Sequence, residues 1–359
     1  MAKKENANKN SIKVGISHGD INGVGYEIII KTFMDKRILE NITPIIFGSS
    51  KAASYHRKAL GIEFNLNLIK YAKNAVDKRT NIVNIIENEV KIELGKSTPT
   101  AGELSFLSLE KATKALQDNE IDVLVTAPIN KNNIQSDSFA FPGHTEYLAK
   151  KFDQQDDLML MISDTLRIGI ITNHLPLKDV SAAITEELIL SKARILQQSL
   201  QKDFAIQKPR IAVLSINPHA GDNGLLGTEE QEVIIPAIKK ANKEGLLLFG
   251  PYPADGLFGS GSYKKFDAIL SMYHDQGMLP FKTIAFDSGV NYTAGLPVVR
   301  TSPAHGTAYD IAGKGFASPD SFREAVYLAC DIYKNRKEYE ALKNNSLSES
   351  TQNSSRETE

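Results

Sequence analysis

The chain has 359 residues, of which 42% are hydrophobic and 24% are charged. This is the composition of a globular protein, and the length indicates two domains or one large α/β unit. The formal net charge of -1 gives no overall field that favours nucleic acid or a membrane surface, so an anionic ligand needs a local basic cluster. A single cysteine, Cys330, excludes a disulfide within the chain and a metal site built from several thiolates.

The chain begins with the polar segment MAKKENANKNS, and no apolar segment of the signal-peptide type follows it. We expect residues 1–11 to form a disordered extension. No run of about 18 apolar residues occurs anywhere, which predicts no membrane-spanning helix. The last residues, 343–359, are rich in Ser, Asn and Glu, and we expect them to form a disordered tail.

Between these ends, short apolar runs alternate with longer segments of helical spacing. The apolar runs predict strands at 12–17, 43–49, 121–129, 166–174, 210–219, 246–254 and 266–274. The helical spacing predicts helices at 26–39, 101–120, 185–204 and 229–245. This alternation indicates an α/β fold with largely parallel strands, in which ligands bind beyond the carboxyl ends of the strands.

A glycine-rich segment, GDINGVGYEII at 19–29, connects the first strand to the first helix. The spacing of Gly19, Gly23 and Gly25 is not that of the dinucleotide fingerprint G-x-G-x-x-G. The segment therefore predicts a tight turn beside a cleft rather than a Rossmann site.

The segment FPGHTEYLAKKF at 141–152 predicts a helix that begins near His144 and Thr145. Backbone N–H groups at such a helix start, together with these two side chains, could hold an anion. Thr145 could equally act as an N-cap with no ligand. Both interpretations stay open on this segment alone.

Three of the seven histidines end apolar runs in the same way: His174 in IGIITNH, His219 in AVLSINPH and His274 in AILSMYH. Strand ends in one sheet can converge, and three neutral imidazoles suit Zn²⁺, Co²⁺ or Mn²⁺. Three protein ligands leave coordination positions open, as catalytic metal sites require. The alternative is that each histidine caps its strand through a backbone hydrogen bond. This alternative stays open because the three histidines are spaced too widely in the chain to form a compact metal motif.

The segment MYHDQG at 272–277 follows the last of these runs. Asp275 could orient an imidazole, or it could cap the next helix or make a structural bond, which is the interpretation we favour. Gly277 is expected to turn the chain.

The segment 281–315 carries Lys282, Asn291 and Arg300 on short extended pieces. Lysine, arginine and an amide suit a phosphate or a carboxylate, although isolated surface charges of this kind need have no function. The next residues, HGTAYDIAGKG at 305–315, have the composition of a ligand-binding loop.

These motifs resemble known proteins. HGTAYDIAGKG is similar to the nucleotide-binding loop of the isocitrate and isopropylmalate dehydrogenase superfamily. Within it, VTAPINK, FPGHTEYLA, NPHAGDNGLLGTEE, PYPADGLF, MYHDQG and GVNYTAGLPVVRTSPAHGTAYDIAGKG resemble the 4-hydroxythreonine-4-phosphate dehydrogenase family of vitamin B6 biosynthesis. The resemblance runs from about residue 12 to about residue 335. The loop GDINGVGYE departs from it, since the family more often has Pro-Ala after the acidic residue and Pro before the glutamate.

The resemblance implies two α/β domains around a central cleft, with largely parallel sheets. A cofactor-binding domain would comprise 12–137 and 282–342, and a metal, substrate and dimerisation domain would comprise 138–281. A homodimer with the metal site at its interface is also implied.

Site residues are implied by the same resemblance. The metal ligands are His174, His219 and His274. The substrate-binding residues are His144, Thr145, Lys282, Asn291 and Arg300, and the cofactor loop contains His305, Gly306, Thr307, Asp310 and Gly313. Asp255 in PYPADGLF is the candidate general base, although it could be only a turn residue before Gly256.

The implied reaction is oxidation of 4-phosphohydroxy-L-threonine at C3, followed by decarboxylation to 3-amino-2-oxopropyl phosphate. Its cofactors are NAD or NADP, with NAD preferred because no decisive arginine for a 2′-phosphate is evident, and one divalent metal (Zn, Co, Mg or Mn) per site. We expect a cytoplasmic enzyme with no nucleic-acid or membrane partner. Alternative activities are threonate or erythronate 4-phosphate dehydrogenase and, more remotely, a phosphate acyltransferase or a non-catalytic metal-binding protein.

Overall fold

A computed structural model describes residues 11–86, 88–154 and 156–354. Contacts between Cα atoms divide the chain into two units, each made of two segments. Among the described residues, unit 1 comprises those up to residue 141 together with 305–326, and unit 2 comprises 142–304 together with those from 327 onwards.

Unit 1 contains five parallel strands in the order β3-β4-β2-β1-β5. They are β1 (Ile12–Ser17), β2 (Ile42–Gly48), β3 (Asn67–Ile69), β4 (Asn81–Asn84) and β5 (Val123–Thr126). Its helices are α1 (Gly25–Met34), α2 (Ser50–Ala59) and α3 (Pro99–Gln117), with short turns η1 (Lys36–Glu40) and η2 (Ala72–Asn74). Helix α3 begins where the Thr98 side chain accepts from the Ala101 N–H and Pro99 supplies a fixed φ, and it packs on β1, β2 and β5.

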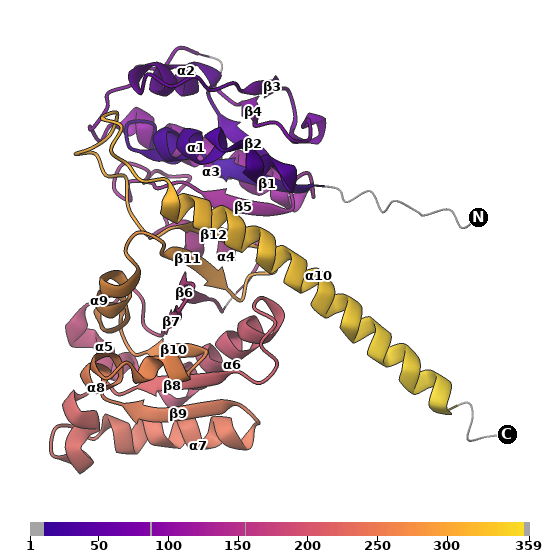
Figure 1. The fold of residues 1–359 in the computed structure, drawn as a ribbon. Coiled ribbons are helices and arrows are strands. Elements are labelled where there is room, and N and C mark those ends of the chain that lie inside the picture. Colours follow the sequence, from indigo (N-terminus) through magenta and orange to yellow (C-terminus); the bar gives the residue numbers. More distant parts are fainter. Residues whose placement is uncertain (1–10, 87, 155, 355–359) are drawn as a thin grey trace. The chain divides into compact units, whose positions relative to one another are not determined.

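Unit 2 contains seven strands in the order β12-β11-β6-β7-β10-β8-β9. They are β6 (Leu158–Ser163), β7 (Leu166–Ile170), β8 (Arg210–Leu214), β9 (Leu247–Tyr252), β10 (Ala268–Ser271), β11 (Val290–Ala294) and β12 (Arg300–Pro303). Strands β7, β10, β8 and β9 are parallel, whereas β12, β11, β6 and β7 pair antiparallel. Figure 1 shows these strands with their helices.

Unit 2 also contains α-helices and short turns of 3₁₀ or π-helix. The helices are α4 (His144–Lys151), α5 (Leu177–Ala183), α6 (Glu186–Lys202), α7 (Ile235–Lys243), α8 (Ala254–Gly259) and α9 (His274–Ala285). The turns are η3 (Pro218–Gly224), η4 (Glu230–Ile234) and η5 (Ser262–Lys265). Helix α9 packs Met278, Phe281 and Ala285 into a core with Ile168 of β7 and Ile269 of β10, which fixes the helix against the parallel strands.

The predicted α/β fold with largely parallel strands is confirmed. Each of the seven predicted strands and four predicted helices overlaps an observed element, with bounds that match at β1 and are shifted or shorter elsewhere. Strand β6 was not among the predicted strands, although its sequence LMLMIS is an apolar run that is buried along its whole length. Among the described residues, no helix is both long and apolar enough to span a membrane.

The units divide the chain differently from the sequence-based division, because residues 282–304 and those after 326 belong to unit 2. Hydrogen bonding explains the difference. Strand β11 pairs with β6 through its whole length. On the last helix, Arg336 donates to Asp203 Oδ1 at 2.6 Å and to the Tyr292 hydroxyl at 2.9 Å, which ties that helix to α6 and β11.

That last helix, α10 (Asp320–Ser354), is the long yellow helix of Figure 1. Its helical backbone continues to residue 354, into the segment 343–359 that we expected to form a disordered tail. Each further residue of an established helix adds one hydrogen bond without a new nucleation cost. Residues 355–359, and residues 1–10 of the expected N-terminal extension, lie outside the described residues.

Candidate functional site

The three predicted metal ligands follow three neighbouring parallel strands of unit 2. Strand β10 pairs with β7 on one side and with β8 on the other. His174, His219 and His274 lie within five residues of the ends of β7, β8 and β10, respectively. Because parallel strands end at the same edge of a sheet, all three histidines belong to loops at one edge.

Hydrogen bonds connect these three loops. Gln276 accepts from the Met272 N–H at 2.8 Å and donates from Nε2 to the Ser215 carbonyl at 2.6 Å, so it joins the loop after β10 to the loop after β8. The Thr172 hydroxyl donates to the Met272 carbonyl at 2.8 Å, which joins the loop after β7 to the same point. Sequence reasoning gave no role to Gln276, since its partner Ser215 lies far away in the chain.

Two of the three imidazoles are neighbours. The ring centroids of His174 and His274 are 5.7 Å apart. His274 Nδ1 lies 2.7 Å from Asp275 Oδ1, which leaves Nε2 for a metal and matches the carboxylate–histidine arrangement of metal sites. Asp275 therefore contacts the imidazole, and the residue at the N-cap of α9 is Tyr273.

His219 does not join that pair within one chain. His219 is exposed, and the backbone is left-handed from His219 to Asn223. Among the described residues, no three His, Cys, Asp or Glu side chains lie close enough to hold a metal ion. The donor types thus fit a divalent metal, and a single copy of the chain gathers two of the three.

Gly277 does not turn the chain, contrary to the expectation. It is buried inside α9, where a Cβ atom would lie 2.6 Å from Ser271 Oγ and 2.9 Å from Ile168 Cγ2. The absence of a side chain allows α9 to pack closely on β10 and β7. His274 is the first residue of this helix and not the last residue of a strand.

The predicted substrate residues Thr145 and Arg300 are connected through Thr293. The hydroxyls of Thr145 on α4 and Thr293 on β11 are 3.1 Å apart, and Arg300 Nη1 donates to the same Thr293 oxygen at 3.4 Å. The N-cap of α4 is Gly143, and no side chain caps this helix, so Thr145 is not the expected helix cap. His144 is the first residue of the same helix.

Arg300 is a buried cation on β12, only 2% exposed. Burial lowers the pKa of its guanidinium to about 9, and the charge of Glu146 opposes that shift. On the paired strand β11, Asn291 has a buried Oδ1 that accepts no hydrogen bond from the described residues. A buried cation and an unpaired buried acceptor are suited to a polar ligand. Lys282 is exposed on α9.

The predicted cofactor residues form an irregular loop of unit 1. His305 is partly buried, and burial lowers its pKa. An added Cβ at Gly306 would meet nothing within 4 Å, which leaves that stretch of backbone open to a close ligand. Gly313 has a φ of 74° and packs against Leu94, so its glycine is required by the turn itself. Asp310 is exposed.

The glycine-rich first loop supports this cofactor loop. Asp20 is buried, and its Oδ2 accepts from the Tyr309 hydroxyl at 2.7 Å and from Asn133 Nδ2 at 2.8 Å. The Val24 N–H donates to the Thr307 carbonyl at 3.0 Å, and a Cβ at Gly23 would lie 2.8 Å from that carbonyl oxygen. The predicted tight turn thus holds the loop at 305–315 in place through hydrogen bonds to Tyr309 and Thr307.

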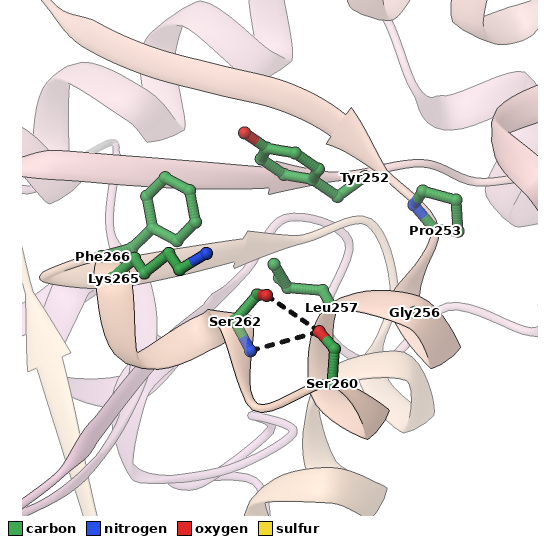
Figure 2. Close-up of a pocket in the computed structure, with 8 residues that line it drawn as sticks. All are labelled: Tyr252, Pro253, Gly256, Leu257, Ser260, Ser262, Lys265 and Phe266. Atoms are coloured by element: carbon green, nitrogen blue, oxygen red, sulfur yellow. Dashed lines mark hydrogen bonds between the residues drawn. The ribbon is translucent and has the colours of Figure 1, made fainter.

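Asp255, the candidate base, is exposed in the first turn of α8. The same helix borders a pocket of about 230 Å³ that Tyr252 and Phe266 also line (Figure 2). Ser260 and Ser262 line this pocket and bond to each other at 2.9 Å between their hydroxyls. None of the predicted site residues lines the pocket.

Comparison with known proteins gives the class of this site. The profile of the family described as "Pyridoxal phosphate biosynthetic protein PdxA" matches residues 40–329. The chain is 54% identical to the 4-hydroxythreonine-4-phosphate dehydrogenase of Bacteroides thetaiotaomicron, over 94% of this chain and 93% of that protein. It is 36% identical to an Oceanobacillus iheyensis protein provisionally named a D-threonate 4-phosphate dehydrogenase, over 89% and 97% of the two chains.

The crystal structure of 4-hydroxythreonine-4-phosphate dehydrogenase from Klebsiella pneumoniae is also similar. It matches 90% of this chain and all of its own, with 30% identity and a TM-score of 0.78. The chain belongs to the PdxA family of pyridoxal phosphate biosynthetic proteins. Its relatives define it as an oxidoreductase of the dehydrogenase class.

Proposed function

We propose that the protein oxidises 4-phosphohydroxy-L-threonine at C3 with a nicotinamide cofactor, and that the 3-keto acid formed loses CO2 to give 3-amino-2-oxopropyl phosphate. The observation that carries this proposal is the set of three histidine loops at one edge of parallel strands in a chain of the PdxA family. The reaction would serve pyridoxal phosphate synthesis, in the cytoplasm.

Within this proposal, His174, His219 and His274 hold one divalent metal, with Zn²⁺, Co²⁺, Mg²⁺ and Mn²⁺ as candidates. When bound, the metal supplies a Lewis acid that makes the substrate hydroxyl more acidic and stabilises the developing negative charge. Asp275 fixes the ring of His274 through its 2.7 Å contact. Gln276 holds the loops of His219 and His274 in register.

The substrate's anionic groups are assigned to His144, Thr145, Lys282, Asn291 and Arg300. Arg300 stays charged at neutral pH, since its pKa of about 9 lies well above 7. The unpaired Asn291 Oδ1 can accept from a substrate hydroxyl or ammonium group. Orienting the substrate in this way is worth roughly 7–11 kcal/mol of barrier in well-aligned systems.

Proton and hydride leave the substrate separately. Asp255 would accept the proton of the C3 hydroxyl, and a nicotinamide held by the loop at 305–315 would supply the acceptor for the hydride from C3. The cofactor is assigned to His305, Gly306, Thr307, Asp310 and Gly313, with NAD preferred over NADP. Fixed support from Asp20 and Val24 keeps this loop in place.

A homodimer with the metal site at its interface completes the proposal. Apolar side chains that flank the three histidines in the chain are exposed, among them Leu177 (72%), Leu225 (77%) and Leu279 (70%). Exposed apolar surface of this kind marks an interaction site. A site shared between two copies is also the arrangement expected when one chain gathers only two of three ligands.

Substrate competition distinguishes this activity from its nearest alternative. The values of kcat/KM are measured for 4-phosphohydroxy-L-threonine and for D-threonate 4-phosphate with the same metal-loaded protein. We expect the amino acid phosphate to be preferred, because the more similar relative carries that name. A higher value for the threonate would assign the protein to sugar-acid metabolism instead.

A further inference from the structure

His219 lies in a run of five residues with left-handed backbone. The φ angles of His219, Ala220, Gly221, Asp222 and Asn223 are 53°, 54°, 76°, 42° and 57°. Only one of the five is a glycine, and a run of left-handed conformation is unfavourable for the other residue types. A run of this kind persists only where surrounding contacts determine it.

Glu230 provides contacts at the root of this loop. Its side chain is 1% exposed, and its Oε1 accepts from the backbone N–H groups of Ile216 and Asn217, both at 2.8 Å. Its Oε2 accepts from Asn217 Nδ2 at 2.9 Å. One buried carboxylate therefore fixes the two residues that lead into Pro218 and His219.

Two glycines close the loop against this carboxylate and its partner. A Cβ at Gly221 would lie 2.6 Å from Glu230 Oε2, and a Cβ at Gly227 would lie 2.4 Å from Asn217 Nδ2. The Leu226 N–H donates to the Gly221 carbonyl at 3.0 Å. The left-handed run is thus folded directly onto the pair formed by Glu230 and Asn217.

A helical irregularity accompanies Glu230. It is the first residue of the π-helical turn Glu230–Ile234, in which the Ile235 N–H donates to the Glu230 carbonyl five residues earlier. Pro236 has no N–H for the carbonyl four residues before it, which favours the wider turn. Single π-helical turns inside helices are frequent at functional sites.

We infer that Glu230 is a positioning residue that holds His219 in the orientation in which it binds the metal. It does so by fixing the root and the left-handed turn of the loop. This inference rests on the proposed metal site. Its consequence is that Glu230 governs metal affinity without touching the metal.

The test is the binding of Co²⁺ alone to metal-free full-length protein, followed by calorimetry and by the visible absorption of the bound ion. Glu230→Ala should raise the Kd about 10–100-fold, the usual loss when support of a ligand is removed, and should change the absorption bands. Glu230→Gln retains Oε1 as the acceptor for both backbone N–H groups and should lose less. The control Glu232→Ala removes an exposed carboxylate of the same turn and should bind as the unmodified protein does.

His219→Ala separates this inference from the metal site itself. If His219→Ala weakens Co²⁺ binding but Glu230→Ala leaves the Kd and the bands unchanged, the positioning role is wrong. If His219→Ala also binds Co²⁺ normally, the metal site is wrong and the inference falls with it. Should Glu230→Ala fail to fold, Gly221→Ala decides, because its Cβ would lie 2.6 Å from the Glu230 carboxylate and would displace the loop. Normal Co²⁺ affinity in folded Gly221→Ala would overturn the inference.

Discussion

Arg300 is the buried cation of the candidate substrate site, and its environment makes it sensitive to substitution. Lysine cannot reproduce the planar fork of a guanidinium. Hydrogen bonds to charged groups are worth about 1.5–3 kcal/mol, so Arg300→Lys should lower kcat/KM for the phosphorylated substrate roughly 10–150-fold. Steady-state kinetics check this, with Arg194→Lys, which alters an exposed ion pair with Glu244, as the control. Equal losses in both variants would contradict a substrate role.

His18 gives the folded state a dependence on pH. Burial lowers its pKa from 6.5 to about 4. Between these values the unfolded chain binds more protons, so stability is fully present above pH 6.5 and is lost as pH falls towards 4. The loss is about 3 kcal/mol at 1.36 kcal/mol per pKa unit.

Denaturant unfolding at pH 7 and pH 4.5 tests this effect in His18→Phe. A phenyl ring can retain the stacking on Tyr26, whose ring centroid is 5.2 Å from that of His18. The variant should lose less stability on acidification than the unmodified chain. Burial also lowers the pKa of His56, so some acid sensitivity should remain. Identical acid sensitivity in the two proteins would remove His18 as its source.

At the scale of single residues, the candidate ligand residues could be predicted from the sequence, whereas the residues that position them could not. Histidines at strand ends, and a lysine, an amide and an arginine in one segment, are visible in the chain itself. Glu230 and Gln276 are not, because their roles depend on partners such as Asn217 and Ser215 that only the folded chain brings near. A buried carboxylate inside a helical pattern gives no local signal of what it accepts.

At the scale of elements, the first loop and the cofactor loop of unit 1 depend on each other. The hydroxyl of Tyr309 donates to Asp20, and burial, with Asp20 beside it, raises the pKa of that phenol to about 12. A single hydrogen bond contributes about 1 kcal/mol net, so Tyr309→Phe should raise the Kd for NADH about fivefold. Fluorescence titration of NADH measures this. Tyr327→Phe, on the exposed surface of α10, should have no effect.

The result for Asp20 should agree in direction. Asp20→Asn should also weaken the binding of NADH, because the carboxylate that accepts hydrogen bonds from Tyr309 and Asn133 becomes a neutral amide. Co²⁺ binding should be unchanged in both variants, since the histidines belong to unit 2. If both Tyr309→Phe and Asp20→Asn bind NADH as tightly as the unmodified protein does, the hydrogen bond between Tyr309 and Asp20 does not contribute to cofactor binding.

Elements with a clear local period were predictable, and elements set by distant contacts were not. Strands β1 and β8 have flanking turn signals and were found with accurate starts at Ile12 and Arg210. The end of α10 could not be predicted, because its polar sequence gives no apolar stripe. The start of α9 at His274 was also missed, since a histidine at the end of an apolar run gives no sign of whether a strand or a helix follows.

At the scale of the whole molecule, the proposed function predicts a dimer in which the histidine loops lie at the interface. Leu225→Glu with Leu279→Glu places charges on two exposed apolar side chains that lie a few residues after His219 and His274 in the chain. The double variant should sediment as a monomer and should bind Co²⁺ more weakly, because the shared site is broken. Leu68→Glu, on an exposed side chain of unit 1, should leave both properties intact. A monomeric unmodified protein with full Co²⁺ affinity would contradict the shared site.

The most direct test of the proposed activity is the appearance of NADH from 4-phosphohydroxy-L-threonine and NAD, followed by absorbance with and without EDTA. We predict that NADH forms with the metal-loaded protein, that EDTA abolishes it and that added Co²⁺ or Zn²⁺ restores it. Folded, metal-loaded protein that forms no NADH from this substrate would contradict the assignment.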